Sequence, residues 1–218
     1  MVFYIGIDDA GRGPVIGPMV LAGVLIEDIK EKELELLEVK DSKLILPSKR
    51  KRIGDILKKD FQWALQVATP EEIDACLNLN HLEAQKMAMV INELAQRTSE
   101  ELIAFIDCPS INVKTWQEYL EKFIIDKERI QVRAEHKADA KYLCVSAASI
   151  IAKEKREGEV ERLKKESHVD FGSGYPADPK TVLFLKENFD NKTFDGIIRH
   201  SWSTVKKLKE KGKQEKLF

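Results

Sequence analysis

Four aspartates could hold a metal ion, because each ends a predicted strand or opens a predicted helix: Asp8, Asp9, Asp107 and Asp139. The carboxyl ends of strands in an open α/β sheet face the functional crevice, so acids that are distant in sequence can meet there. Carboxylates held close together raise one another's pKa, and a hard divalent cation relieves this repulsion. Two such cations about 3.5–4 Å apart can activate water and stabilise a leaving oxygen, which suits phosphodiester hydrolysis. A helix cap or a surface charge is the alternative for each aspartate taken singly.

The segment Gly11-Arg12-Gly13 follows the first two acids closely. Glycine permits positive φ and a close approach of the backbone, so neighbouring N–H groups can point at an anion or a sugar hydroxyl. Arg12 can contact a phosphate oxygen. A tight turn alone would explain these three residues, but beside two acids they predict a backbone clamp next to a metal site.

Two further side chains have both a chemical and a structural interpretation. His136 precedes Asp139 and could help to deprotonate water or release a product, although a surface or packed histidine is the favoured interpretation. Tyr175 lies in the turn-rich segment GSGYPADP and could stack on a sugar or base, or pack within the turn.

The elements that must position these residues follow from hydrophobic periodicity. Strands are predicted in short apolar or alternating runs: Val2–Asp8, the later part of Val15–Ile26, Phe61–Ala68, Leu102–Cys108 and Ile130–Ala134. Helices are predicted over Pro47–Lys59, Asn80–Arg97, Trp116–Phe123, Asp139–Lys165, Thr181–Glu187 and Ser203–Lys211. The second of these helices has an apolar stripe of Leu82, Ala88, Met89, Ile91 and Leu94. The alternation of strands and helices predicts an α/β fold with parallel pairing in the second half.

Composition is compatible with one catalytic domain and a small appendage. The chain has 218 residues, of which 43% are hydrophobic, enough to form a core. We expect a catalytic domain over residues 1–171 and a helical subdomain over residues 172–218, where a turn-rich segment begins. A net charge of −1 is unusual for a nucleic-acid binder, but basic residues concentrate in Ser48–Arg52 and Lys206–Lys216.

The cysteines and the N-terminus indicate a cytoplasmic protein. Cys76, Cys108 and Cys144 lie far apart and form no C-x-x-C pair, which argues against structural zinc and against disulfides. No apolar stretch reaches membrane-spanning length, and the N-terminus lacks the basic lead and cleavage site of a signal peptide. We expect a monomer with no membrane partner.

Seven segments resemble, in order, those of type 2 ribonucleases H (ribonuclease HII). They are GIDDAGRGPVIGP at Gly6–Pro18, VKDSK at Val39–Lys43, NLNHLEA at Asn78–Ala84, IDCP at Ile106–Pro109, AEHKADAKY at Ala134–Tyr142, VSAASIIAK at Val145–Lys153 and GSGYPADP at Gly172–Pro179. The resemblance runs from residue 2 to about Trp202, and its later segments are similar to the archaeal branch.

The resemblance implies a ribonuclease H-like fold, a mixed five-stranded sheet flanked by helices, with a C-terminal helical subdomain that closes over the substrate. It implies an endonuclease that uses Mg²⁺ or Mn²⁺ to hydrolyse the RNA strand of RNA–DNA hybrids and to cut 5′ to ribonucleotides embedded in DNA. The ends produced are 3′-hydroxyl and 5′-phosphate. By motif position, the catalytic and metal-binding residues are Asp8, Asp9, Asp107 and Asp139. The substrate-binding residues are Gly11, Arg12, Gly13, Lys43, Ser146, Ser149 and Tyr175. A small-residue packing face explains the two serines equally well.

Two departures from the family pattern leave alternatives open. Asp9 stands where the family has Glu, and Leu143 stands where it usually has Pro. The first touches the metal site, so a hybrid- or junction-binding protein with impaired catalysis is the alternative function. A metal-dependent phosphatase or phosphotransferase would also use clustered acids, but it would not need the Gly-Arg-Gly loop.

The C-terminal segment Gln214–Phe218 partly resembles the start of sliding-clamp-binding peptides carried by some relatives. A frayed basic tail is the favoured alternative, because the usual downstream aromatic pair is incomplete.

Overall fold

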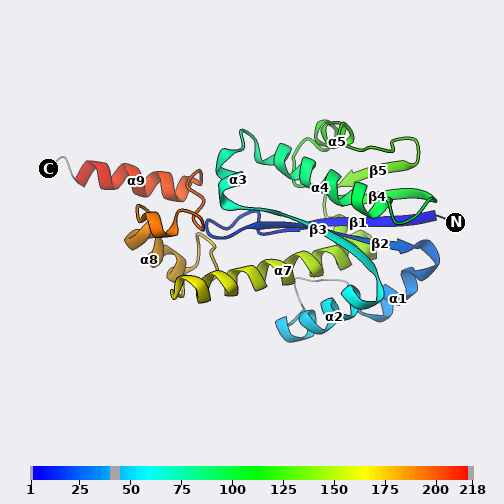
Figure 1. The fold of residues 1–218 in the computed structure, drawn as a ribbon, viewed down its shortest axis with the longest axis horizontal. Helices are drawn as coiled ribbons and strands as arrows, with labels where there is room; N and C mark the ends of the chain where they lie inside the picture. The colour runs from blue at the N-terminus through cyan, green and yellow to red at the C-terminus, as the bar shows by residue number, and fades with distance from the viewer. Residues whose placement is uncertain (1, 40–44, 216–218) are drawn as a thin grey trace. The chain divides into compact units, whose positions relative to one another are not determined.

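The computed structural model describes residues 2–39 and 45–215, with side chains up to Glu210 (Figure 1). Lys43, predicted to contact a phosphate, lies outside the described residues. The chain divides into two compact units. The first comprises Met1–Ala10, Val20–Val67 and Asn78–Lys155, and the second comprises Gly11–Met19, Ala68–Leu77 and Arg156–Phe218. The second unit therefore adds three earlier pieces of chain to the expected subdomain at residues 172–218, and the domain division at residue 171 stays a prediction.

A mixed five-stranded sheet forms the centre of the first unit, with the strand order β3-β2-β1-β4-β5. The strands are β1 (Val2–Ala10), β2 (Met19–Glu27), β3 (Gln62–Ala68), β4 (Glu101–Asp107) and β5 (Ile130–Glu135). Strand β1 pairs antiparallel with β2 and parallel with β4, which itself pairs parallel with β5. The predicted mixed sheet and the parallel pairing in the second half are thus confirmed.

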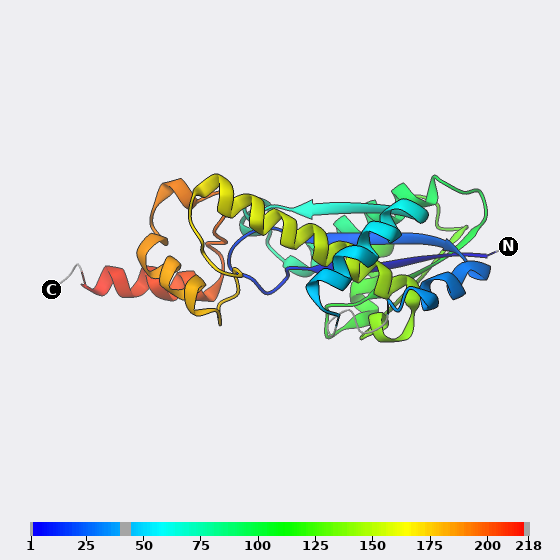
Figure 2. The ribbon, with the colours of Figure 1, turned by 90° about the horizontal axis from the view of Figure 1, so that it is seen from below.

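Helices cover both faces of this sheet (Figures 1 and 2). The helices that begin in the first unit are α1 (Glu31–Leu36), α2 (Pro47–Asp60), α4 (Leu79–Ala95), α5 (Val113–Glu121), α6 (Ala138–Lys141) and α7 (Leu143–Ser167). Helices α4 and α5 lie on one face, and α1, α2 and the start of α7 lie on the other. Helix α7 comes against β1 at Gly6, where a Cβ atom would lie 2.1 Å from the carbonyl carbon of Cys144. A residue without a side chain is therefore what lets α7 approach the strand that carries the first acids.

The buried stripe of α4 differs from the predicted one at Met89. Met89 is 51% exposed, whereas Met87 is fully buried together with Ile91 and Leu94. Because successive helical residues turn by about 100°, a side chain two positions from Met87 points away from the sheet. Helical spacing identified the element, but one member of the stripe was wrong.

The helix predicted over Asp139–Lys165 is two helices. The backbone of Tyr142 is extended, with φ −114° and ψ 124°, which separates α6 from α7. Leu143 is the first residue of α7, the helical position that proline favours because its missing N–H has no partner there. The break between the two helices is thus present with leucine at this position.

The second unit packs around a core cluster of its own: Val15, Ile16, Val160, Phe171, Phe184, Leu185, Phe194, Ile198 and Val205. Its helical elements are α3 (Pro70–Ala75), the end of α7, α8 (Pro179–Asn188), a 3-10 turn (Lys192–Phe194) and α9 (Ser203–Glu215). Helix α3 was not predicted, although its start carries a capping box in which Thr69 and Glu72 exchange side-chain and backbone hydrogen bonds. The sequence T-P-E-E was the available signal.

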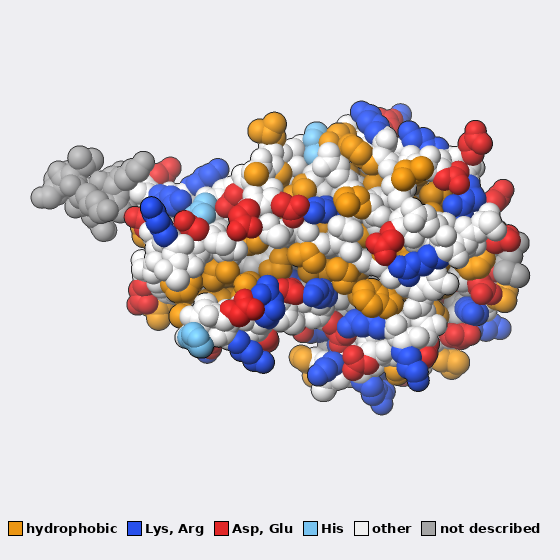
Figure 3. Space-filling view, viewed as in Figure 1, with side chains coloured by type: hydrophobic (Ala, Val, Ile, Leu, Met, Phe, Trp, Pro, Cys, Tyr) orange, Lys and Arg blue, Asp and Glu red, His pale blue; other side chains and the backbone are white. Residues whose placement is uncertain are grey.

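Charged side chains of both signs are interspersed on the face shown in Figure 3, as the net charge of −1 would suggest. Within residues 2–39 and 45–215, no helix combines the length and the apolar character needed to cross a lipid bilayer.

Candidate active site

The ends of two neighbouring parallel strands bring the first acids together. In the register of β1 and β4, Ile7 lies opposite Ile106, so Asp8 and Asp107 are the next residues along each strand. Asp107 is itself opposite Glu135, at the end of β5. Acids at the ends of parallel strands thus lie at one edge of the sheet, as predicted from the sequence.

The third acid arrives on the short helix α6. The backbone N–H of Ala138 donates to Asp107 Oδ1 over 3.0 Å, which fixes the start of α6 at the end of β4. As a result, Asp8, Asp107 and Asp139 each offer a carboxylate oxygen, and these atoms all lie within 4.8 Å of one another. Asp8 is buried, and the other two are half-buried.

The pKa of the Asp8 carboxyl reflects first its burial and then the nearby acids. Burial raises the pKa of the Asp8 carboxyl well above its usual range, and the charges of Asp9 and Asp107 raise it further. Hydrogen bonds from the Ser149 hydroxyl and from the Asp9 backbone N–H, the latter over 2.7 Å, act in the opposite direction. Ionising Asp8 in the folded protein is therefore energetically unfavourable, and a bound cation would offset that free-energy cost.

Ser146 and Ser149 are turned toward the acids. Both are buried, with 1% and 0% of their surface exposed. The Ser146 hydroxyl donates to the backbone carbonyl of Asp139, and Ser149 bonds the carboxyl of Asp8. Direct contact with a substrate stays a prediction, and the structure favours a role for both serines in positioning the acids.

Asp9 differs from the other three predicted metal ligands. Among the described residues, the close carboxylate group contains Asp8, Asp107 and Asp139 but not Asp9. Its backbone continues regular pairing with β2, where Asp9 lies opposite Leu21. The charge of Asp9 still acts on Asp8, so it lies near the cluster without joining it.

His136 lies in the connection from β5 to α6. Its Nδ1 is 3.1 Å from the carbonyl oxygen of Cys108, and since a carbonyl can only accept, Nδ1 carries the proton. In neutral His136 the other nitrogen, Nε2, is then an acceptor. The side chain is exposed, which fits both the proton-transfer role and the surface role that the sequence allowed.

The Gly11-Arg12-Gly13 loop belongs to the second unit. Gly11 has φ +91°, and a Cβ atom there would lie 2.8 Å from the carbonyl oxygen of Pro18. Glycine is therefore required at this position, both for its left-handed backbone and for the close approach. A Cβ atom on Gly13 would lie 3.7 Å from the Tyr175 ring, so the loop and the predicted stacking residue are neighbours.

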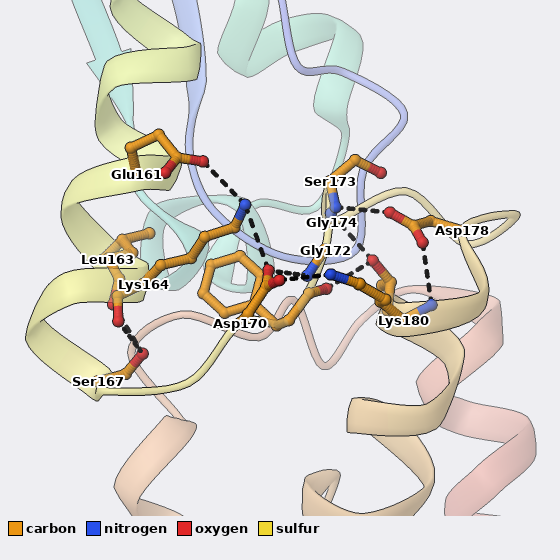
Figure 4. A network of polar contacts seen from close by, with 12 residues as sticks. Glu161, Leu163, Lys164, Ser167, Asp170, Gly172, Ser173, Gly174, Asp178 and Lys180 are labelled. Atoms are coloured by element: carbon orange, nitrogen blue, oxygen red, sulfur yellow. Dashed lines mark hydrogen bonds and ion pairs between the residues drawn. The ribbon is translucent and has the colours of Figure 1, made fainter.

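A polar network fixes the turn that carries Tyr175 (Figure 4). Lys180 Nζ lies 2.6 Å from an Asp170 carboxylate oxygen, and Asp178 accepts from the backbone N–H of Ser173 over 2.6 Å. The Lys180 contact holds the pKa of Asp170 down at about 2, so this acid is ionised at any mildly acidic or neutral pH. The turn has a defined conformation, as a binding surface requires.

Tyr175 itself is 43% exposed, and the guanidinium of Arg156 lies 5.1 Å from its ring centre. Arg156 is buried, and it donates to the carbonyl of Ser173 over 2.8 Å. The tyrosine therefore presents an accessible ring on a fixed support.

Sequence reasoning missed three residues around this loop: Arg156, Arg199 and Trp202. Arg156 stands in a charged stretch that reads as a solvated helix face, and the segment IIRHSW has no pattern that marks a site. Their contacts depend on the fold, and no local signal could have found them.

The chemistry of the acid cluster fits a divalent cation. The donors are carboxylate oxygens, which Mg²⁺ and Mn²⁺ prefer, and no thiol or imidazole belongs to the group among the described residues. Burial, followed by the charges of Asp9 and Asp107, raises the pKa of Asp8, and a cation bound to these oxygens would stabilise the ionised carboxylate against both effects.

Comparison with known proteins gives the family. The family model described as Ribonuclease HII matches residues 5–205. The "Ribonuclease HII" of Methanocaldococcus jannaschii is 42% identical, over 100% of this chain and 99% of that protein.

Solved structures agree with this match. The ribonuclease H2 from Pyrococcus horikoshii OT3 has a TM-score of 0.87 and 37% identity, covering 97% of this chain and 99% of that one. The ribonuclease HII in a complex with PCNA from Archaeoglobus fulgidus has a TM-score of 0.81 and 38% identity, covering 92% of this chain and 95% of that one. The family model, the similar sequences and the similar structures agree. The chain therefore belongs to the ribonuclease HII family and is an endonuclease of the ribonuclease H type.

Proposed function

We propose that this protein hydrolyses the RNA strand of RNA–DNA hybrids and cuts on the 5′ side of ribonucleotides embedded in duplex DNA, leaving 3′-hydroxyl and 5′-phosphate ends. The observation that carries the proposal is the group of three carboxylates at the ends of β1 and β4 and on α6, with oxygens within 4.8 Å. The family match speaks against a metal-dependent phosphatase or phosphotransferase.

The acids would act by two-metal catalysis. Asp8, Asp107 and Asp139 would hold Mg²⁺ or Mn²⁺, with Asp9 at the margin of the site. Bound cations would supply charge stabilisation for the attacked phosphate and for the leaving oxygen. Ser149 holds Asp8 in place, and Ala138 holds Asp107 through its backbone N–H. His136, with Nε2 able to accept, is placed to take up a proton near Asp139.

Substrate recognition would rest on the second unit. The Gly11–Gly13 backbone would read the 2′-hydroxyl, the feature that separates RNA from DNA at a given position. The exposed ring of Tyr175 would stack on the neighbouring sugar or base. Arg12 would contact a phosphate, and so would Lys43, which lies outside the described residues.

The test compares three labelled 20-bp substrates: an all-DNA duplex, a DNA duplex with one ribonucleotide, and an RNA–DNA hybrid. With Mg²⁺ or Mn²⁺ we expect cleavage of the second on the 5′ side of the ribonucleotide, cleavage of the third, and an intact first. Equal cutting of the all-DNA duplex would refute recognition of the 2′-hydroxyl. Tight binding without cleavage in either metal would instead support the junction-binding alternative, with Asp9 as its cause.

A sliding clamp is proposed as a protein partner, through the tail Gln214–Phe218. The Archaeoglobus fulgidus relative was solved in a complex with PCNA, and the last three residues of this tail lie outside the described residues. A pull-down with the cognate clamp is expected to lose the protein once the last five residues are deleted. Equal recovery of the full-length and shortened chains would leave the frayed basic tail as the correct interpretation.

A further inference from the structure

The carbonyl groups of the Gly11-Arg12-Gly13 loop all turn toward two side chains near the C-terminus of the second unit. Arg199 donates from Nη2 to the carbonyl of Gly11 over 2.7 Å and from Nη1 to that of Arg12 over 3.1 Å. Trp202 donates its indole N–H to the carbonyl of Gly13 over 3.2 Å. Each carbonyl of the loop therefore has a side-chain donor.

Arg199 is buried in a way that makes this arrangement rigid. None of its surface is exposed, and its third donor, Nε, reaches the carbonyl of Gly17 over 2.8 Å. Trp202 covers the guanidinium, whose central carbon lies 4.9 Å from its ring. A buried cation is costly unless it is hydrogen-bonded, so the loop carbonyls and Arg199 hold one another in place.

The backbone of the arginine adds further ties. Its N–H donates to the carbonyl of Val15 over 2.9 Å, and Ile198 forms a bridge with Ile16. The segment that carries Arg199 is therefore fixed to the chain that continues from the loop.

The hydrogen bonds from Arg199 determine where the N–H groups of the loop point. The described peptide bonds are trans, and in a planar trans peptide the C=O of one residue and the N–H of the next point in opposite directions. Carbonyls of Gly11 and Arg12 that face Arg199 thus direct the N–H groups of Arg12 and Gly13 away from it. The carbonyl of Gly13 precedes Pro14, which has no N–H to place.

We propose that Arg199 is a positioning residue that sets the preference for ribose by holding the Arg12 and Gly13 N–H groups away from itself. Trp202 supports it by covering the guanidinium and by anchoring the Gly13 carbonyl at the end of the loop. This inference rests on the proposed reading of a 2′-hydroxyl by the loop. Arginine is specifically suited, since its planar fork places donors on three separate carbonyls, whereas a lysine ammonium is a single point.

The experiment measures the affinity of each protein for an all-DNA duplex and for the same duplex with one ribonucleotide, in EDTA so that neither is cut. The variants are Arg199→Lys and Trp202→Phe. The second removes the indole N–H donor and keeps an aromatic ring. Trp63→Phe is the matched control, because Trp63 makes the same kind of bond to the carbonyl of Lys58 over 3.0 Å in the first unit.

For Arg199→Lys we expect the preference for the ribonucleotide duplex to fall by about tenfold, the size of one lost hydrogen bond to a charged group, with all-DNA affinity unchanged. Trp202→Phe should lower the preference less, and Trp63→Phe should leave it intact. If Arg199 acted in folding alone, the substitution would lower the melting temperature and reduce the affinity for both duplexes equally. That result would overturn the inference. If Arg199→Lys does not fold, a wild-type preference in Trp202→Phe overturns it instead. If the wild-type protein does not prefer the ribonucleotide duplex, the proposed reading of the 2′-hydroxyl by the loop is wrong, which is a different result from a failure of the role of Arg199.

Discussion

Replacing Asp8, Asp107 or Asp139 by asparagine is expected to reduce cleavage of an RNA–DNA hybrid to background while the protein stays folded. Each substitution removes a charged ligand from the group with oxygens within 4.8 Å. Metal-based charge stabilisation contributes several kcal/mol to a transition state, so the loss should be about a thousandfold or more. Single-turnover cleavage in Mg²⁺ and in Mn²⁺ measures it.

The melting temperature should hold or rise in these variants, most of all in Asp8→Asn. Because the folded-state pKa of Asp8 is raised, its ionised form opposes folding. Wild-type stability is thus fully present below the unfolded-state pKa, about 4, and falls as pH rises through the folded-state pKa. The advantage of Asp8→Asn should therefore be absent in acid and grow toward neutral pH.

Two controls distinguish this account from a nonspecific effect. Asp60→Asn changes an exposed acid of the same unit and should alter neither activity nor melting temperature. Added Mg²⁺ or Mn²⁺ should raise the melting temperature of the wild-type protein and have little effect on the three variants, since a ligand that binds the folded state stabilises it. Near-full activity in any of the three would remove that residue from the site.

The Asp9→Glu substitution is expected to accelerate cleavage in Mg²⁺ by at least several-fold and by up to about a hundredfold, the cost of a misplacement near 1 Å. The aspartate carboxylate stands back by one C–C bond, about 1.5 Å, from where a glutamate would place it. Asp9 remains paired opposite Leu21 and Ala10 opposite Val20 in regular register, so no bulge displaces this part of the strand. The added methylene is the direct way for this acid to reach the group.

The gain should be smaller in Mn²⁺, because Mg²⁺ demands near-ideal octahedral geometry and tolerates displaced ligands poorly. Affinity for a hybrid in EDTA should not change, since the loop of Gly11–Gly13 and the phosphate contacts are untouched. Asp28→Glu adds the same methylene at a site remote in sequence, in a 3-10 turn, and should have no effect. A rate for Asp9→Glu no higher than the parent's in Mg²⁺ would mean that the present backbone already serves a shorter carboxylate.

Much of the site was predictable because its signals are local. The acids Asp8 and Asp107 end apolar runs whose lengths and patterns identify strands, and parallel pairing brings such ends to one edge. The glycines of the loop permit a left-handed backbone, and Gly11 adopts one with φ +91°. These properties depend on a few neighbouring residues, so a single sequence is enough to identify them.

What the tertiary structure alone decided is which distant groups meet. Arg199 reaches carbonyls 182 to 188 residues earlier in the chain, and no local pattern encodes such a contact. Likewise, Asp9 was predicted as a fourth metal ligand, whereas the close group among the described residues contains Asp8, Asp107 and Asp139. Periodicity specifies elements and the faces they bury, but burial of a polar side chain depends on partners that only the folded chain supplies. That is why the grouping of Asp8, Asp107 and Asp139 could be predicted from the sequence, whereas the contacts of Arg199 with the Gly11–Gly13 loop could not.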